Sequence, residues 1–310
     1  MLEQLLNQIA IILILIAVAY YARKKGLITD AIHRGLSGLV VNIGVPAAIL
    51  GMVSYEPEAY QRNMYFFGVL LSLIYHFGLF YIMKLLTPKL FHKPGQAKIA
   101  VLLVTFSNSM FLGFPILQGL YGAEILLYGG AIVVSFNLAM YSVGLGSLQD
   151  ERADKTPLWK KIVTPFNIAT AILIVFLYTG LQWPRPIQES LDYLSSINTP
   201  LSLFVIGSSL AISDLREVFT DKKLYLVSLL RCLVVPLIVT LLLTQLPLSL
   251  DPDLIRAMVV LSAMPSAANN AMLAEEAEVE PAWAARAVTQ TTLLFMPTIL
   301  IIVPLMEALL

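Results

Sequence analysis

The residues of this chain that could hold a ligand lie in two interrupted apolar runs. The first run contains Ser107–Pro115, which reads SNSMFLGFP, and the second contains Ser262–Asn270, which reads SAMPSAANN. A proline inside a helix removes a backbone hydrogen bond. In lipid, the freed backbone groups are tolerated only where protein buries them or where they line a wet cavity. The two segments therefore predict broken helices around a binding site.

The chemistry available at such breaks favours anions. Each helix that restarts after a break presents N–H groups and roughly half a positive charge, which suit a carboxylate, whereas the preceding carbonyls suit a cation. The alternative is that the Asn and Ser side chains only satisfy bent backbone or join helices. We predict a substrate site at Ser107, Asn108, Ser109, Gly113, Pro115, Asn137, Pro265, Ser266, Asn269, Asn270, Gln290 and Thr291, with sodium as a further candidate ligand near Asn108, Ser262 and Asn269.

Few other side chains are candidates for chemistry. Arg231 lies inside an apolar run and is interpreted either as reaching the membrane interface or as guiding anions. His76 is interpreted as a hydrogen-bonded packing residue rather than a titrating group. No Asp occurs at the centre of a predicted span, which disfavours a proton relay. Since metal-protease, phosphate-loop and CxxC motifs are also lacking, we predict neither an enzyme nor a cofactor.

The composition indicates an all-α, multi-pass membrane protein. The mean hydropathy is +0.80 and 13% of residues are charged, against about 25% in soluble domains. The zero net charge gives no indication of nucleic-acid binding, so the lipid bilayer is the predicted partner. A span needs about 20 apolar residues. The sequence predicts ten spans, at 5–22, 34–53, 63–86, 98–120, 123–147, 162–182, 189–212, 223–246, 253–275 and 282–307.

The distribution of Lys and Arg predicts the orientation in the cell membrane. Loops after odd-numbered spans carry 16 of these residues and the opposite loops carry 3. Cytoplasmic loops are enriched in Lys and Arg, so both termini are expected on the non-cytoplasmic side.

The hydrophilic stretch 148–161 divides the chain into two halves, 1–147 and 162–310, with five predicted spans each. An odd number of spans per half, with a cytoplasmic linker between the halves, predicts two repeats that enter the membrane in opposite directions. The two interruptions fall on the fourth predicted span of each half. This correspondence favours one shared site over two unrelated proline kinks.

Several motifs resemble the auxin efflux carrier family over nearly the whole chain. They are RKKGL at Arg23–Leu27, SNSMFLGFP, the following GLYG at Gly119–Gly122, and the segment from Met264 to Leu294. The resemblance implies a fold akin to bile-acid/sodium symporters, with spans 4 and 9 crossing at Pro115 and Pro265. It also implies a moving transport domain of spans 3–5 and 8–10, and a scaffold of spans 1, 2, 6 and 7 that forms a homodimer through spans 2 and 7.

Together with this resemblance, the sequence predicts secondary transport of small organic anions; the resemblance implies an elevator mechanism and substrates such as auxin-like acids, malate or malonate. Efflux without a coupling ion is compatible, because an anion leaves a negative-inside cell downhill, and sodium coupling stays open. Two further functions are compatible with the sequence: a membrane module that senses a ligand without transporting it, and a cation/proton antiporter. The short central linker argues against regulation by phosphorylation of that loop.

Overall fold

The computed structural model describes residues 2–54, 59–148, 163–246 and 249–310. Of the predicted linker 148–161, only Leu148 is described; residues 149–161 and residue 162 lie outside the described residues. The described part is helical, with one isolated β-bridge. In the first half the α-helices are α1 (Leu2–Lys24), α2 (Asp30–Leu39), α3 (Val45–Gly51), α4 (Ala59–Leu90), α5 (Pro94–Thr105), α6 (Phe114–Tyr121), α7 (Leu126–Ala139) and α8 (Leu145–Leu148).

The second half has a similar content of helices. They are α10 (Pro165–Thr179), α11 (Arg185–Ser196), α12 (Asn198–Ile212), α13 (Leu215–Thr220), α14 (Lys222–Leu229), α15 (Val235–Gln245), α16 (Pro252–Ser262), α17 (Ala268–Glu276) and α18 (Pro281–Leu309). Short turns connect several of them: the π-helical η1 (Val40–Gly44), η3 (Ser109–Gly113), η4 (Met140–Gly144) and η5 (Leu230–Val234), and the 3₁₀-helical η2 (Met52–Ser54).

Seven helical segments of the described chain are long and apolar enough to cross a membrane. They are Leu2–Lys24, Asp30–Ser54, Asn63–Leu90, Leu126–Leu148, Arg185–Ile212, Lys222–Gln245 and Pro281–Leu309. The other three predicted spans contain shorter helices: α10 has 15 residues, and the predicted spans 98–120 and 253–275 are each divided into two helices, α5 with α6 and α16 with α17. An all-helical protein with several helices able to cross a membrane is thereby confirmed. The number of ten spans and their arrangement in two inverted repeats stay predictions.

Prolines explain three of the π-helical turns. Pro46, Pro115 and Pro236 each stand second in the α-helix that follows a π-helical turn. A proline inside a helix leaves the carbonyl four residues earlier without its donor. The wider π-helical turn accommodates this local change in hydrogen bonding, so the helix continues instead of ending.

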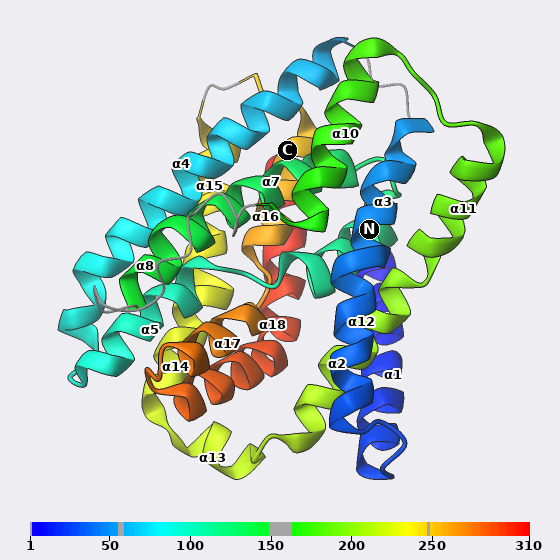
Figure 1. The fold of residues 1–310 in the computed structure, drawn as a ribbon. Helices are drawn as coiled ribbons and strands as arrows, with labels where there is room; N and C mark the ends of the chain where they lie inside the picture. Colours follow the sequence, from blue (N-terminus) through cyan, green and yellow to red (C-terminus); the bar gives the residue numbers. More distant parts are fainter. Residues whose placement is uncertain (1, 55–58, 149–162, 247–248) are drawn as a thin grey trace.

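The helices associate in two groups (Figure 1). In one group, α1 packs along α12, and α3 contacts α10 and α11. Gly207 permits the close approach of α12 to α1, because a Cβ at this position would lie 2.3 Å from the Ile16 carbonyl oxygen. In the other group, α4 packs against α5 and α7, α15 against α16, and α18 against α14 and α17. The interrupted helix pairs lie in this second group, between residues 105 and 109 and between residues 262 and 268.

Candidate functional site

The two interruptions of the helices pair with each other. Residues 106–108 and 263–267, called the paired breaks below, are joined by an antiparallel β-bridge between Ser107 and Ser266. The Asn108 N–H donates to the Pro265 carbonyl at 2.8 Å. Unwound backbone inside a membrane needs internal partners, and here each break supplies partners for the other.

Further hydrogen bonds hold the paired breaks together. The Phe106 carbonyl accepts from the Ala267 N–H and from the Asn270 side-chain amide, each at 3.0 Å. The Ser266 hydroxyl donates to the Leu103 carbonyl at 2.6 Å. Asn270 and Ser266 are both fully buried. These two predicted site residues therefore stabilise the backbone arrangement through their side chains.

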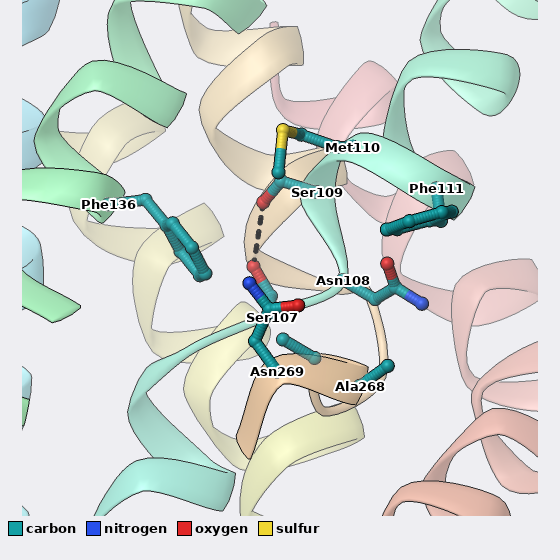
Figure 2. Close-up of a pocket in the computed structure, with 9 residues that line it drawn as sticks. Ser107, Asn108, Ser109, Met110, Phe111, Phe136, Ala268 and Asn269 are labelled. Carbon is teal, nitrogen blue, oxygen red and sulfur yellow. Dashed lines mark hydrogen bonds between the residues drawn. The ribbon is translucent and has the colours of Figure 1, made fainter. Parts of the chain in front are cut away.

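A small cavity lies against the paired breaks (Figure 2). The cavity has a volume of about 10 Å³, which is room for about one water molecule. Ser107 and Ser109 share a hydrogen bond between their hydroxyl oxygens at 3.0 Å. The lining residues are Ser107, Asn108, Ser109, Met110, Phe111, Phe136, Ala267, Ala268 and Asn269.

The Asn108 side chain is the uncommitted polar group of this cavity. Asn108 is 6% exposed, and no hydrogen bond joins its side-chain amide to another described residue. Neither atom of the Asn108 amide is among the fully buried unpaired side-chain atoms of the described chain, because the side chain lines both the small cavity and a larger one. Asn108 precedes η3, and Ala267 precedes α17, and neither helix start has a side-chain cap. The Ser109 N–H donates to the Ser107 carbonyl and the Asn270 N–H donates to the Ala267 carbonyl, so the other N–H groups of these two helix starts are available to a ligand.

A larger cavity of about 550 Å³ connects the paired breaks to one end of the molecule. It reaches Asn108 and Asn269 and is lined by residues of α2, α12, α17 and α18. Its outer part carries charged groups, among them the ion pair between Arg286 and Glu217. A separate cavity of about 320 Å³ at the other end is lined by residues of α3, α6, α7 and α11 together with short connecting segments.

Arg231 lies at the opposite side of the paired breaks, where α5 and α16 end. It is fully buried, so the interpretation that it reaches the membrane interface is wrong. Its Nε donates to the Met264 carbonyl at 2.9 Å, Nη1 donates to the Val104 carbonyl at 2.7 Å, and Nη2 donates to the Ser262 carbonyl. These contacts show that the guanidinium donates to protein carbonyls. A role of Arg231 in guiding anions stays a prediction.

The two predicted crossing prolines have different positions. Pro265 lies in the second break, as expected. Pro115 follows Asn108 by seven residues and stands in α6, where its carbonyl accepts from the Gln8 side-chain amide at 3.1 Å. The interruption lies at the Asn108 end of the predicted break, because η3 accommodates the N–H that Pro115 lacks, and a crossing at Pro115 stays a prediction.

Gly113 contributes space rather than a polar group. A Cβ at this position would lie 2.4 Å from Leu261 Cδ2 and 3.3 Å from Met264 Cγ. Glycine therefore allows η3 to approach α16 and the second break closely.

The polar residues of α18 support neighbouring elements. The Gln290 side chain accepts from the Ser228 hydroxyl at 2.8 Å and donates to the Val218 carbonyl at 2.7 Å. Thr291 Oγ1 accepts from the Ser266 N–H at 3.2 Å. Thr291 thus contacts the paired breaks directly, whereas Gln290 joins α18 to α13 and α14.

Two residues flank the site from α4 and α7. The His76 Nδ1 lies 2.8 Å from the Ser72 carbonyl oxygen, and its ring packs against Phe106 and Phe136. These contacts agree with the interpretation of His76 as a packing residue. Asn137 is buried and lines an adjacent cavity of about 300 Å³ that also contacts Asn269.

Sequence reasoning missed the apolar part of the lining. Phe111 lies within SNSMFLGFP, and its position inside this segment was a usable signal. Phe136 precedes the predicted Asn137 and had no signal of its own. Ala267 and Ala268 were missed because small apolar residues are common in helices.

A metal ion at this site would depend on neutral oxygen ligands. Within the described ranges, no three His, Cys, Asp or Glu side chains gather closely enough to hold a metal. Carbonyl, hydroxyl and amide oxygens near Asn108, Ser262 and Asn269 are the groups that a sodium ion would use. Of these, the Ser262 carbonyl already accepts from Arg231.

Comparisons with known proteins identify the family. Residues 4–303 match the family described as membrane transport protein. An uncharacterized transporter of Methanocaldococcus jannaschii is 27% identical over 68% of this chain and 70% of its own length. The uncharacterized transporter YfdV of Escherichia coli is 21% identical over 86% of this chain and 87% of its own length. A protein of Rhizobium meliloti named "Putative malonate transporter" is 26% identical over 52% of this chain and 50% of its own length. The chain belongs to the auxin efflux carrier-like family of membrane transport proteins.

Proposed function

We propose that this protein is a secondary transporter of small organic carboxylates and that the substrate binds at the paired breaks. The observation that carries the proposal is the buried Asn108 amide, which has no described partner and lies beside two helix starts without side-chain caps. A carboxylate accepts hydrogen bonds from such N–H groups and amides, and the charge at each helix start favours an anion.

The small cavity alone has room for about one water molecule, so a small acid would also occupy the adjoining part of the 550 Å³ cavity, which shares Asn108, Phe111 and Asn269 with it. The Ser107 and Ser109 hydroxyl groups can reorient to donate to an oxygen, and Phe111 and Phe136 provide apolar surface. The relative named "Putative malonate transporter" supports an organic acid as the class of substrate. Malate, malonate and indole-acetate are therefore the first compounds to test.

Movement of one helix group against the other is the proposed transport step. The paired breaks belong to the group that contains α4, α5, α7 and α14–α18, and the 550 Å³ cavity lies partly between this group and α2 and α12. The cavity opens at the end that the Lys and Arg pattern assigns to the cytoplasm. We propose that the substrate enters here and is released on the other side after the group slides along the scaffold of α1, α2–α3, α10 and α11–α12.

We also propose that two copies associate through α2 and the α11–α12 segment. No residue of α2 or α11 is buried, and apolar side chains of both segments are exposed. Exposed examples are Ile32 and Leu39 in α2, Ile43 in the adjoining η1, and Ile187, Leu194 and Ile197 in the α11–α12 segment.

The test combines binding with exchange. We expect malonate, malate or indole-acetate to raise the melting temperature of the purified protein and to support counterflow in proteoliposomes. Asn108→Ala is expected to weaken binding at least about tenfold, equivalent to 1.4 kcal/mol. Asn42→Ala is the matched control, because the Asn42 amide is exposed and donates only to the carbonyl of Gly38. Binding without exchange would indicate a sensor, and unchanged binding by Asn108→Ala would refute the site.

A further inference from the structure

Arg231 is a fully buried cation without an acidic partner. In the described part of the chain, none of the ion pairs includes Arg231. A buried charge is costly unless it is paired and hydrogen-bonded. The counter-charge of Arg231 must therefore come from other groups that surround it.

The ends of α5 and α16 supply that counter-charge. Arg231 donates to the Val104 carbonyl and lies 3.4 Å from the Thr105 carbonyl at the end of α5, and it donates to the Ser262 and Met264 carbonyls at the end of α16. The carboxyl-terminal end of a helix carries about half a negative charge. Two such ends therefore balance about one positive charge, which is the charge of one guanidinium.

We propose that Arg231 is the resident counter-cation of the paired breaks. Resting on the proposed function, this assigns Arg231 as a positioning residue for the substrate site. Arg231 neutralises the carboxyl-terminal helix ends, so the helix starts after Asn108 and Ala267 remain as uncompensated positive charge for a carboxylate. It also occupies carbonyls that an added cation would need as ligands. Substrate binding consequently requires no coupling cation.

The shape of arginine matters for this role. The planar guanidinium presents donors in fixed directions, and here three nitrogen atoms reach carbonyls from two helix ends. A lysine ammonium is a compact point charge on a flexible stem. Arg231→Lys should therefore retain the charge but bridge the two ends less well, whereas Arg231→Ala removes both and leaves a space beside the carbonyls.

The experiment measures melting temperature and malonate counterflow of the full-length protein in sodium chloride, potassium chloride and choline chloride at equal ionic strength. For the unmodified protein, we expect less than a twofold change in counterflow when choline replaces sodium. Arg231→Ala should lose at least tenfold in counterflow and should melt earlier. Methylguanidinium or sodium should partly restore both properties, because a cation that binds the folded state stabilises it.

Arg185→Ala is the matched control, since this arginine is exposed and its ion pair with Glu189 lies on the surface. Its melting temperature should respond to methylguanidinium and sodium as that of the unmodified protein does. A tenfold dependence of the unmodified protein on sodium would overturn the inference. So would unchanged counterflow in Arg231→Ala, or a melting temperature of that variant that no cation raises.

Two further measurements test the inference if Arg231→Ala does not fold or if no carboxylate binds. If Arg231→Ala does not fold, Arg231→Lys and the sodium dependence of the unmodified protein still test the inference. For Arg231→Lys we expect intermediate counterflow, and counterflow equal to that of the unmodified protein would contradict the need for a bridging guanidinium. If no carboxylate binds to the unmodified protein, the proposed function fails, whereas cation-dependent melting of the Arg231 variants still tests the counter-cation.

Discussion

The two sides of the paired breaks are treated differently by the protein. On the side where α5 and α16 end, Arg231 is completely buried and donates to the carbonyls that the two helix ends leave without an intrahelical donor. On the side where η3 and α17 begin, no side chain caps the helices and the Asn108 amide has no described partner. Buried polar groups normally find partners. The difference therefore separates backbone that the protein satisfies itself from backbone that is open to a ligand.

The comparison also separates two kinds of asparagine. The Asn270 amide nitrogen donates to the Phe106 carbonyl at 3.0 Å, whereas its buried Oδ1 has no partner among the described residues. Asn108 and Asn269 line the cavities, and the side chain of Asn108 makes no hydrogen bond to another described residue. Substitutions on the committed side, where side chains hydrogen-bond the broken backbone, should change stability. Substitutions on the open side, where side chains line the cavities, should change ligand binding.

The largest stability effect outside Arg231 is expected for Gly113→Ala. The new methyl group would lie 2.4 Å from Leu261 Cδ2, which forces η3 away from α16. Overpacking of this kind costs about 1–3 kcal/mol, so the melting temperature should fall. Gly35→Ala is the control, because nothing lies within 4 Å of the Cβ that it would add. Equal melting temperatures of the two variants would show that the close approach is unimportant.

A smaller loss is expected for Thr291→Val, which keeps the shape and removes the hydroxyl group. The Ser266 N–H would lose its acceptor at 3.2 Å and remain buried without a partner. Because this hydrogen bond is long, we expect a loss of about 1 kcal/mol, at the lower end of the cost of an unpaired buried donor. Denaturation by heat in detergent measures it, and Thr298→Val serves as the control because the Thr298 hydroxyl group donates only within its own helix. A loss no larger than that of the control would remove Thr291 from the support of the breaks.

The smallest stability effects distinguish the two asparagines. Asn270→Ala should destabilise the protein by about 1 kcal/mol, because one hydrogen bond to the Phe106 carbonyl is lost while the Ala267 N–H remains. Asn108→Ala should leave the melting temperature without ligand unchanged but reduce its rise with malonate. The reverse pattern, with Asn108→Ala destabilised and still responsive to malonate, would contradict the division into a committed and an open side.

The positions of the helix breaks could be predicted from the sequence better than the groups that hydrogen-bond to the broken backbone. SNSMFLGFP and SAMPSAANN were identified as matched interruptions, and the structure pairs them through Ser107 and Ser266. Such segments stand out because small polar residues and a proline interrupt apolar runs. Pro115 was assigned to the break because a proline identifies a defect in a helix without locating it, and here a π-helical turn accommodates the defect.

Arg231 could not be assigned from the sequence, because its partners are carbonyls. Every residue has a carbonyl, so no residue type marks the acceptors of Arg231, which are 31 to 127 positions away along the chain. The same reason applies to Asn270 and Gln290, whose amides bind distant carbonyls at Phe106 and Val218. A polar side chain in an apolar run indicates burial, but only the fold shows whether it faces protein or ligand.

The most direct test of the open side is chemical labelling of Ala268→Cys. Ala268 begins α17 and lines both the small cavity and the 550 Å³ cavity. The native Cys232 is buried, and Ser209→Cys in the wall of the larger cavity serves as the control. We predict that a membrane-impermeant maleimide labels Ala268→Cys from the cytoplasmic side and that a carboxylate substrate slows this labelling at least fivefold without slowing that of Ser209→Cys. Labelling of Ala268→Cys that no bound carboxylate slows would contradict a substrate site at the paired breaks.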